Sequence, residues 1–460
     1  MRASKCAVAI TTISILSVVT SGIALAGQGG SKDKKTAEVV QQDPTAELNG
    51  VLNLEKSILL GLKYQNTLGI ASSQLDSSKA RLVQSRSSYY PQVTPTYNYN
   101  TSKTTQKFNG VTQTGTVESG VTQIGASMLI FDSFKREENV LVSKYGVKGS
   151  EANVFDIRQN VIVNITVAYY ELLRKKELVR VAQSSVERAD TTLKATRAFA
   201  EAGTSPRKDV LQAEADYDNA VVQLSISKND VKIGMTNLKN AIGILSTLPV
   251  VVDDAPLPIP DATPDGKTTS DYLKQAYANR YDLKREQAFI DADRHSVKVA
   301  QIGAGVQVQA SVTEGYRIDP NPGENRVFAT GVSYPLFDAG SARASVRQAK
   351  ATLDQDRRSL QLSKQNILSD VEANFLTREE ARLRIGSTTS AVKAARENYK
   401  AATEAQKEGA GTIIDVITAQ NLLVTSETNA VQAVYDYYNS DARLRRAIGT
   451  NDPYPGGKKP

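Results

Sequence analysis

Leu129-Ile130-Phe131-Asp132 returns 206 positions later as Pro335-Leu336-Phe337-Asp338. The same separation relates Gly203 to Gly409. Further pairs at this separation are Tyr169 and Phe375, Val186 and Val392, Ala189 and Ala395, Lys194-Ala195 and Lys400-Ala401, Asp209-Val210 and Asp415-Val416, and Leu238-x-x-Ala241-Ile242-Gly243 and Leu444-x-x-Ala447-Ile448-Gly449. A separation that stays constant over so long a stretch indicates an internal duplication without insertions or deletions.

The duplication divides the chain into two repeats, which we expect at residues 48–243 and 269–449. Residues 244–268 contain five prolines and are expected to be a linker, because proline fits neither a helix interior nor a central strand. Ahead of Phe131 the separation grows to 215, so the first repeat has nine additional residues, which we expect in a loop. Residues 450–460 are rich in Pro, Gly and Lys and are expected to form a flexible tail.

The N-terminus has the features of an export signal, which we expect at residues 1–26. Arg2 and Lys5 make the start basic, an apolar stretch follows from about residue 7 to 19, and Ala24-Leu25-Ala26 supplies small residues at the cleavage spacing. The alternative is an uncleaved membrane anchor, for which the apolar core is short. Cys6, the only cysteine, would leave with the signal, so the mature chain would have no disulfide. Residues 27–47 form a polar N-terminal segment.

Two long stretches without proline, residues 135–202 and 339–408, are rich in residues that favour helices. In the first of them, residues with apolar side chains recur every seven positions: Ile165, Leu172, Val179, Val186, Leu193 and Ala200. Alanines on the neighbouring stripe permit close helix packing of the coiled-coil type. A helix of this length would measure ~100 Å, which favours an element that bridges a distance over one inside a globular domain. A fibrous coiled coil is the alternative.

Each long helix is expected to end in a tight turn. Gly203-Thr204-Ser205-Pro206 supplies a glycine for the helix C-terminus, Ser205 as the next N-cap and Pro206 as the first helical position. The second turn, at about 409–412, runs from Gly409 to Thr412. A return helix then extends to Gly243 or Gly449, so each repeat contains an antiparallel helical hairpin.

Between the helical stretches the apolar period falls to two, which is typical of strands. Residues 306–313 alternate without a break, and Ile124, Ala126, Met128 and Ile130 share one face. Turn sequences at Asn109-Gly110 and at residues 320–323 predict two hairpins, within about 91–131 and about 304–337. We expect strands of about ten residues each.

One apolar face would also suit strands that cover a soluble core. The export signal and the position of the strands at the end of long helices instead favour a membrane barrel with an apolar exterior. Four strands cannot close such a barrel, and unpaired backbone groups at a sheet edge are not tolerated in lipid. The pattern therefore predicts an oligomer, without fixing the number of copies.

The remaining composition indicates no catalytic or nucleic-acid-binding chemistry. The formal charge is +7, or +5 without Arg2 and Lys5, and the basic residues are dispersed, which favours a mildly basic surface over a nucleic-acid site. The single histidine, His295, has charged neighbours in a helical stretch, and we expect it at the surface. Neither a phosphate-binding Gly-x-x-x-x-Gly-Lys motif nor a Gly-x-Ser-x-Gly nucleophile motif occurs. We expect no enzymatic activity, no cofactor and no metal.

Taken together, these features resemble the TolC family of outer membrane efflux proteins over about residues 48–450. The duplication, the long helices and the short strand pairs carry the resemblance. Local matches are Leu52-Asn53-Leu54-Glu55, Leu129-Ile130-Phe131-Asp132, Pro335-Leu336-Phe337-Asp338, and the turn segments 202–210 and 408–416.

The resemblance implies a mostly helical fold with a small β part and a homotrimer. The helices of three copies would form a hollow tube through the periplasm, and their strands a 12-stranded barrel within outer membrane lipid. Such ducts export small toxic compounds or, in type I secretion, proteins. The implied partners are a periplasmic adaptor protein and an inner-membrane pump of the RND or ABC type.

The resemblance also points to functional residues at the closed periplasmic tip of the tube. Asp415 corresponds to the acidic residue of the pore constriction, where three carboxylates would favour cations. Asp209 corresponds to an acidic position in contacts that hold the tip shut. The turn residues Gly203, Thr204, Gly409 and Thr412 are implied as adaptor contacts.

A plainer role exists for both acids, since Thr412-x-x-Asp415 reads as a capping box and Asp209 falls in the first turn of its helix. The sequence also departs from the family at the tip. A second acid often follows three positions after the first, where this chain has Thr418, and latch residues of the family correspond to Gln406 and Gly411.

We therefore expect an outer-membrane exit duct. An exported coiled-coil scaffold or adaptor is the second interpretation, although it would need neither strand pairs nor matched turns. A hydrolase carried on helices is the third.

Overall fold

The computed structural model describes residues 51–244, 250–253, 255–260, 266–303, 305–319 and 321–453. From Leu52 onward these residues belong to one compact unit. The expected signal peptide, the polar segment 27–47, part of the linker and most of the tail lie outside the described residues.

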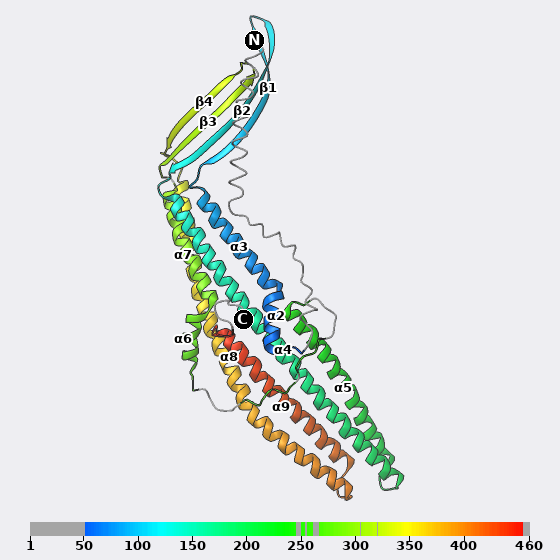
Figure 1. Cartoon of the computed structure of the whole chain (residues 1–460). Coiled ribbons are helices and arrows are strands. Elements are labelled where there is room, and N and C mark those ends of the chain that lie inside the picture. Colours follow the sequence, from blue (N-terminus) through cyan, green and yellow to red (C-terminus); the bar gives the residue numbers. More distant parts are fainter. Residues whose placement is uncertain are drawn as a thin grey trace. The chain divides into compact units, whose positions relative to one another are not determined.

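The described elements repeat in the same order. The first repeat contains α2 (Leu54–Tyr64), α3 (Asn66–Ser87), β1 (Gln92–Phe108), β2 (Val111–Phe131), α4 (Lys135–Glu201) and α5 (Arg207–Ile242). The second contains α6 (Thr269–Asn279), α7 (Tyr281–Ile302), β3 (Gln307–Asp319), β4 (Gly323–Ser333), α8 (Ser341–Lys407) and α9 (Ile413–Ala447). Within this unit the strands lie at one end of the long helices and the two helical turns at the other (Figure 1).

The long helices α4 and α8 each contain 67 residues, as their composition predicts. The repeated tetrapeptides explain where they begin. The last residues of the tetrapeptides, Asp132 and Asp338, accept hydrogen bonds from the backbone N–H of Arg136 (2.9 Å) and Ala342 (2.7 Å). A carboxylate at this place satisfies a helical N–H that has no partner inside the helix and favours the positive end of the helix dipole.

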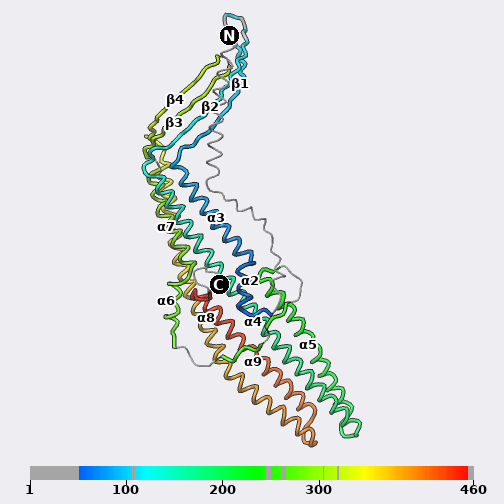
Figure 2. The backbone as a smooth tube through the Cα atoms, in the orientation of Figure 1, coloured from blue at the N-terminus to red at the C-terminus, as the bar shows by residue number. Residues whose placement is uncertain are grey.

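The four strands form one antiparallel sheet in the order β1-β2-β3-β4. β1 and β2 contain 17 and 21 residues, so the expected length of about ten holds only for the second hairpin, with 13 and 11. Pairing of β2 with β3 reaches only Gly120, and beyond it β1 and β2 continue as a two-stranded ribbon (Figure 2). The additional length of the first repeat therefore lies in strands, and its assignment to a loop was wrong.

The sheet has one mainly apolar and one mainly polar face. Val93, Ala126, Val312 and Phe328 form one row across all four strands, because each is paired directly with the next. A row on the opposite face contains Thr96, Gln123, Gly315 and Asn325. The predicted alternation is thus confirmed in these two rows. The next row on the apolar side, Pro95, Ile124, Glu314 and Arg326, departs from it because its last two residues form an ion pair. The strand expected up to residue 337 ends earlier, at Ser333, and Leu336 and Phe337 are 92% and 89% exposed beyond it.

The predicted heptad stripe of α4 contributes to the core of the helical part at three of its six positions, whereas Val179, Val186 and Ala200 are only partly buried. Ile165 and Leu172 are fully buried and Leu193 is 5% exposed. Alanines beside them, Ala182 and Ala189, are buried as well, which brings neighbouring helices close. Among the described residues, no helix is both long and apolar enough to cross a membrane.

A buried polar junction joins the two repeats where α7 and α9 meet α4. The carboxylate of Asp156 on α4, 7% exposed, contacts Arg446 of α9 at 2.5 Å and Arg285 of α7 at 3.5 Å. Nearby, Arg280 binds Asp282 and also donates to the carbonyl of Ala447 at 3.1 Å. Burial by itself would raise the pKa of Asp282, but its hydrogen bonds and charge attraction to Arg280 outweigh this and lower it.

The structure corrects the expectation of a surface His295. Its side chain is only 17% exposed, and Nδ1 lies 2.5 Å from a carboxylate oxygen of Glu138 on α4. The ring also stacks on Tyr145 at a centroid distance of 5.4 Å. His295 therefore joins α7 to α4, which a helical sequence with charged neighbours does not reveal.

Carboxyl groups face each other across the contact between α7 and α8. Burial, followed by the hydrogen bond and charge of Asp356 on α8, raises the pKa of Asp293 on α7 to about 6. One heptad earlier, the hydroxyl of Ser363 on α8 donates to the carboxylate of Glu286 at 2.7 Å, and burial raises the pKa of Glu286. The carboxylates of Asp293 and Asp356 therefore repel each other unless they share a proton.

We predict that Asp293→Asn stabilises the protein at neutral pH. The pKa of Asp293 in the folded state, about 6, lies above its ordinary value of 3.8, so its ionisation destabilises the folded state as pH rises between these values. Because the site is partly open to water, the gain should be on the order of 1 kcal/mol above pH 6 and vanish below pH 4. Thermal unfolding in detergent at pH 4, 6 and 8 measures it.

Asp354→Asn is the matched control, since Asp354 lies on α8 close to Asp356 but is 59% exposed and paired with Arg358. An Asp293→Asn protein with the same pH dependence as the parent would contradict the prediction.

Candidate functional site at the helical turns

The turn between α4 and α5 is closed by backbone hydrogen bonds. Gly203 has a φ of 78°, a value that strongly favours glycine, and it lets the chain reverse after Glu201. The backbone N–H and the hydroxyl of Thr204 both donate to the carbonyl of Phe199 at 2.9 Å. Thr204 therefore satisfies a carbonyl at the end of α4.

Ser205 does not act as the expected N-cap. α5 begins at Arg207, and Pro206 occupies the N-cap with an extended ψ of 152°. The hydroxyl of Ser205 instead donates to a carboxylate oxygen of Asp209 at 3.0 Å. Asp209 is half-buried in the first turn of α5.

The turn between α8 and α9 is built in a similar way and has the predicted capping box. Gly409 has a φ of 77°, and Thr412 is the N-cap of α9. The N–H of Asp415 donates to the hydroxyl of Thr412 at 3.3 Å, and the N–H of Thr412 donates to the Asp415 carboxylate at 2.9 Å. Hydrogen bonds from the side chain and backbone of Thr412 hold the pKa of Asp415 below its usual value. The exposed carboxylate is therefore ionised at neutral pH.

Asp209 and Asp415 thus occupy equivalent places in the two repeats, each bonded within its own turn. Both turns lie at the end of the helical part opposite the sheet (Figure 1). The exposed surface of each turn contains Gly203 and Thr204 in one case and Gly409 and Thr412 in the other.

The positions that depart from the family pattern have defined surroundings. Gly411 donates its N–H to the carbonyl of Ala405 at 3.0 Å. A Cβ there would lie 3.2 Å from the Cβ of Ala405 and from the backbone N of Gln406. A larger side chain at Gly411 would have to displace this turn. Thr418 is exposed on α9, one turn after Asp415.

Contacts between the two hairpins lie just behind the turns and were not predicted from the sequence. Ile413 and Ile417 of α9 pack with Leu193 of α4 and Ala213 of α5. One turn further, the amide of Gln420 donates to Asp216 of α5 at 2.9 Å, although Gln420 is only 1% exposed. Burial raises the pKa of Asp216, partly offset by this bond.

An ion-pair cluster continues the connection along α9. Glu427 contacts Arg188 of α4 at 3.1 Å and Arg396 of α8 at 3.4 Å. One carboxylate thereby joins three helices from both repeats. The available sequence signal is weak: Gln420 and Glu427 are spaced one heptad apart, on a helix whose buried residues are mostly apolar.

Comparison with known proteins agrees with this architecture. A family model described as outer membrane efflux protein matches residues 62–244 and 272–450. The chain belongs to this family. Accordingly, it is a channel protein of the outer membrane.

The similarity to known proteins extends over most of this chain and most of each relative. The outer membrane efflux protein BepC of Brucella suis is 25% identical over 438 residues, which are 94% of this chain and 89% of the relative. The outer membrane protein TolC of Vibrio cholerae is 23% identical, over 82% of this chain and 86% of the relative. The solved outer-membrane channel OprN has the same fold, with a TM-score of 0.75, 19% identity and coverage of 86% and 89%.

We predict that Glu427→Ala loosens the two hairpins. The side chains of Arg188 and Glu427 are only 18% and 15% exposed, so removal of the carboxylate leaves the partly buried guanidinium of Arg188 without this partner. Arg396 is 58% exposed and loses less. The cost should be about 1–3 kcal/mol, between that of an exposed and a fully buried pair. Thermal unfolding in detergent measures it.

Asp190→Ala provides the control, because Asp190 pairs with Lys194 on the surface of α4, where the side chains are 38% and 73% exposed. Equal destabilisation by the two substitutions would show that the cluster at Glu427 does not connect the hairpins.

Proposed function

We propose that this family member is one protomer of a homotrimeric exit duct that carries small toxic compounds or proteins outward, with no catalytic activity of its own. The observation that carries this proposal is the sheet: β1 and β4 are its two edges, and the described part of one chain supplies four strands to it. Edges cannot remain unpaired in lipid, so copies must pair β4 of one with β1 of the next. Three copies would give the 12 strands that the resemblance implies.

The two faces of the sheet support a barrel around water. The apolar row from Val93 to Phe328 would face lipid, with Tyr97 and Tyr99 near one boundary and Phe131 near the other. Aromatic rings at both boundaries are typical of outer-membrane barrels. The opposite face would line the lumen.

The polar face has few charges with which to select cargo. On β1, β2 and β3 its central rows contain amide, hydroxyl and glycine residues, namely Gln92, Thr94, Thr96, Gln123, Gly125, Ser127, Gln309, Ser311, Thr313 and Gly315. On β4 the same face contains Asn325, Val327 and Ala329, which are also uncharged. Glycines on this face leave the lumen wide. We therefore assign charge selection to the other end of the duct.

At the helical turns, three copies would bring three Asp415 carboxylates around one axis. Mutual repulsion would raise their pKa values, whereas the hydrogen bonds from Thr412 lower the pKa of Asp415 and oppose this. A ring of ionised carboxylates attracts cations and repels anions. In this proposal Asp209 supports the closed arrangement through the first turn of α5.

The exposed turn residues Gly203, Thr204, Gly409 and Thr412 are proposed as contacts for a periplasmic adaptor. An inner-membrane pump, of the RND or ABC type, would supply the energy for transport, because a passive duct supplies none. The buried contacts at Gln420 and Glu427 would then resist separation of the hairpins when the tip opens.

We predict that Asp415→Asn lowers the preference of the channel for cations. Asparagine can still accept a hydrogen bond at the helix N-terminus, so the change removes charge with little loss of capping. The ratio of cation to anion permeability should fall about twofold or more, since the ring of charge is lost. Reversal potentials in planar bilayers under a salt gradient measure it.

Asp190→Asn, far from the turns on the surface of α4, should leave selectivity unchanged. An Asp415→Asn channel with the selectivity of the parent would remove Asp415 from the constriction. A purified chain that is monomeric and dissolves without detergent would overturn the proposed duct.

A further inference from the structure

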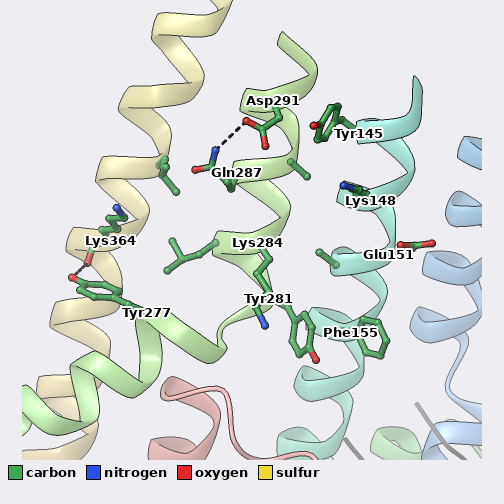
Figure 3. A pocket seen from close by; sticks show the side chains of 14 residues that line it. Tyr145, Lys148, Glu151, Phe155, Tyr277, Tyr281, Lys284, Gln287, Asp291 and Lys364 are labelled. Atoms are coloured by element: carbon green, nitrogen blue, oxygen red, sulfur yellow. Dashed lines mark hydrogen bonds between the residues drawn. The ribbon is translucent and has the colours of Figure 1, made fainter. Parts of the chain in front are cut away.

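An open groove of about 650 Å³ lies between α4, α7 and α8, well away from the helical turns. Figure 3 shows side chains of all three helices directed into it, with Tyr277 from α6 at one end. Its volume is in the range of ligand-binding pockets, which is about 300–1,000 Å³. The floor is apolar, with Ala152, Leu283 and Ala288 buried.

The groove combines aromatic rings with lysines. Phe155 and Tyr281 stack at a centroid distance of 4.9 Å, and the ammonium group of Lys284 lies 4.4 Å from the centre of the Tyr281 ring. Lys148 lies in the same way over Tyr145, at 4.9 Å. Lys364, Gln287, Glu151 and Asp291 add polar groups to the rim (Figure 3).

A heptad stripe on α4 shows on which face of the helices the groove opens. Lys148, Phe155, Ile162, Tyr169 and Lys176 follow one another at steps of seven and therefore share a face. Lys176 donates to the carbonyl of Val252 at 3.1 Å, and the Tyr169 hydroxyl bonds the carbonyl of Asp253 at 3.4 Å. The linker thus crosses this face. In a hollow tube it must be the outer face, since a second layer on the inner one would fill the bore.

The groove lies at a position along α4 that is away from both the helical tip and the membrane. At about 1.5 Å per residue, Tyr145 and Phe155 lie about 15 and 30 Å from the first residue of α4, and Phe155 lies about 70 Å from its last. An adaptor bound at the turns would be far away. The groove would face the periplasm shortly beneath the outer membrane, a placement that rests on the proposed function.

We propose that this groove binds a glycan strand of the cell wall. A pyranose ring has apolar faces of C–H groups, which pack on an exposed aromatic ring such as that of Tyr277. Its hydroxyl and acetamido groups need donors and acceptors, which Gln287, Glu151 and Asp291 supply. The peptides carried by such a strand have carboxylates, which the three lysines complement. A neutral apolar ligand would leave these lysines unused.

The test is co-sedimentation of the purified, detergent-solubilised protein with insoluble peptidoglycan sacculi. The variant Lys148→Glu/Lys284→Glu/Tyr277→Ala changes exposed side chains of the groove. We expect its affinity for sacculi to fall about tenfold, as the loss of a few central contacts typically produces. Neutral oligomers of N-acetylglucosamine should compete with the parent protein for sacculi.

Lys393→Glu/Lys407→Glu is the control, with the same change of charge at exposed lysines of α8 outside the groove. Equal weakening by both variants, or no competition by the neutral oligomers, would overturn the proposal in favour of general ionic attraction. It would also fail if sacculus binding were unchanged while the groove variant lost adaptor-dependent efflux in cells. Conductance in planar bilayers separates the two proposals. Channels that conduct normally but do not bind sacculi would refute the proposed glycan binding and leave the proposed duct intact.

Discussion

The edges of a four-stranded sheet impose the main constraint on this molecule. Each backbone N–H and C=O along β1 and β4 that points away from the sheet needs a partner, and in lipid water cannot supply one. A chain with one apolar sheet face and two such edges is incomplete by itself. The proposed assembly of several copies around a water-filled lumen follows from this requirement, whereas the number of three is implied by the family resemblance.

Because of the duplication, each strand hairpin is connected to a helical hairpin of its own. Each repeat contains one strand hairpin and one helical hairpin. In both repeats the long helix begins and ends with the same kinds of residue. Asp132 and Asp338 begin it, and Gly203 and Gly409 end it. The two hairpins are then joined by contacts that have no counterpart by duplication, such as Gln420 with Asp216 and Glu427 with two arginines.

Much of the fold could be predicted because its signals are local and periodic. The lengths of α4 and α8, the alternating strands and the capping box at Thr412 and Asp415 all depend on residues close together in the sequence. The pairing of His295 with Glu138 could not be predicted, because 157 positions separate them and nothing in either segment identifies the other. For the same reason, the sequence did not reveal the contacts of Gln420 and Glu427. The capping role of the turn acids could be read from nearby residues, whereas their proposed role at the pore came only from the family resemblance.

The equal length of α4 and α8 limits how this molecule can change its span. One added residue turns everything beyond it by about 100° around the helix axis, which would carry the buried stripe to the surface. Only steps of about seven residues restore the stripe, and a step in one repeat alone would leave the two turns at different heights. Related ducts that reach across a wider or narrower gap should therefore differ by whole heptads, inserted in both halves together and on both arms of each hairpin.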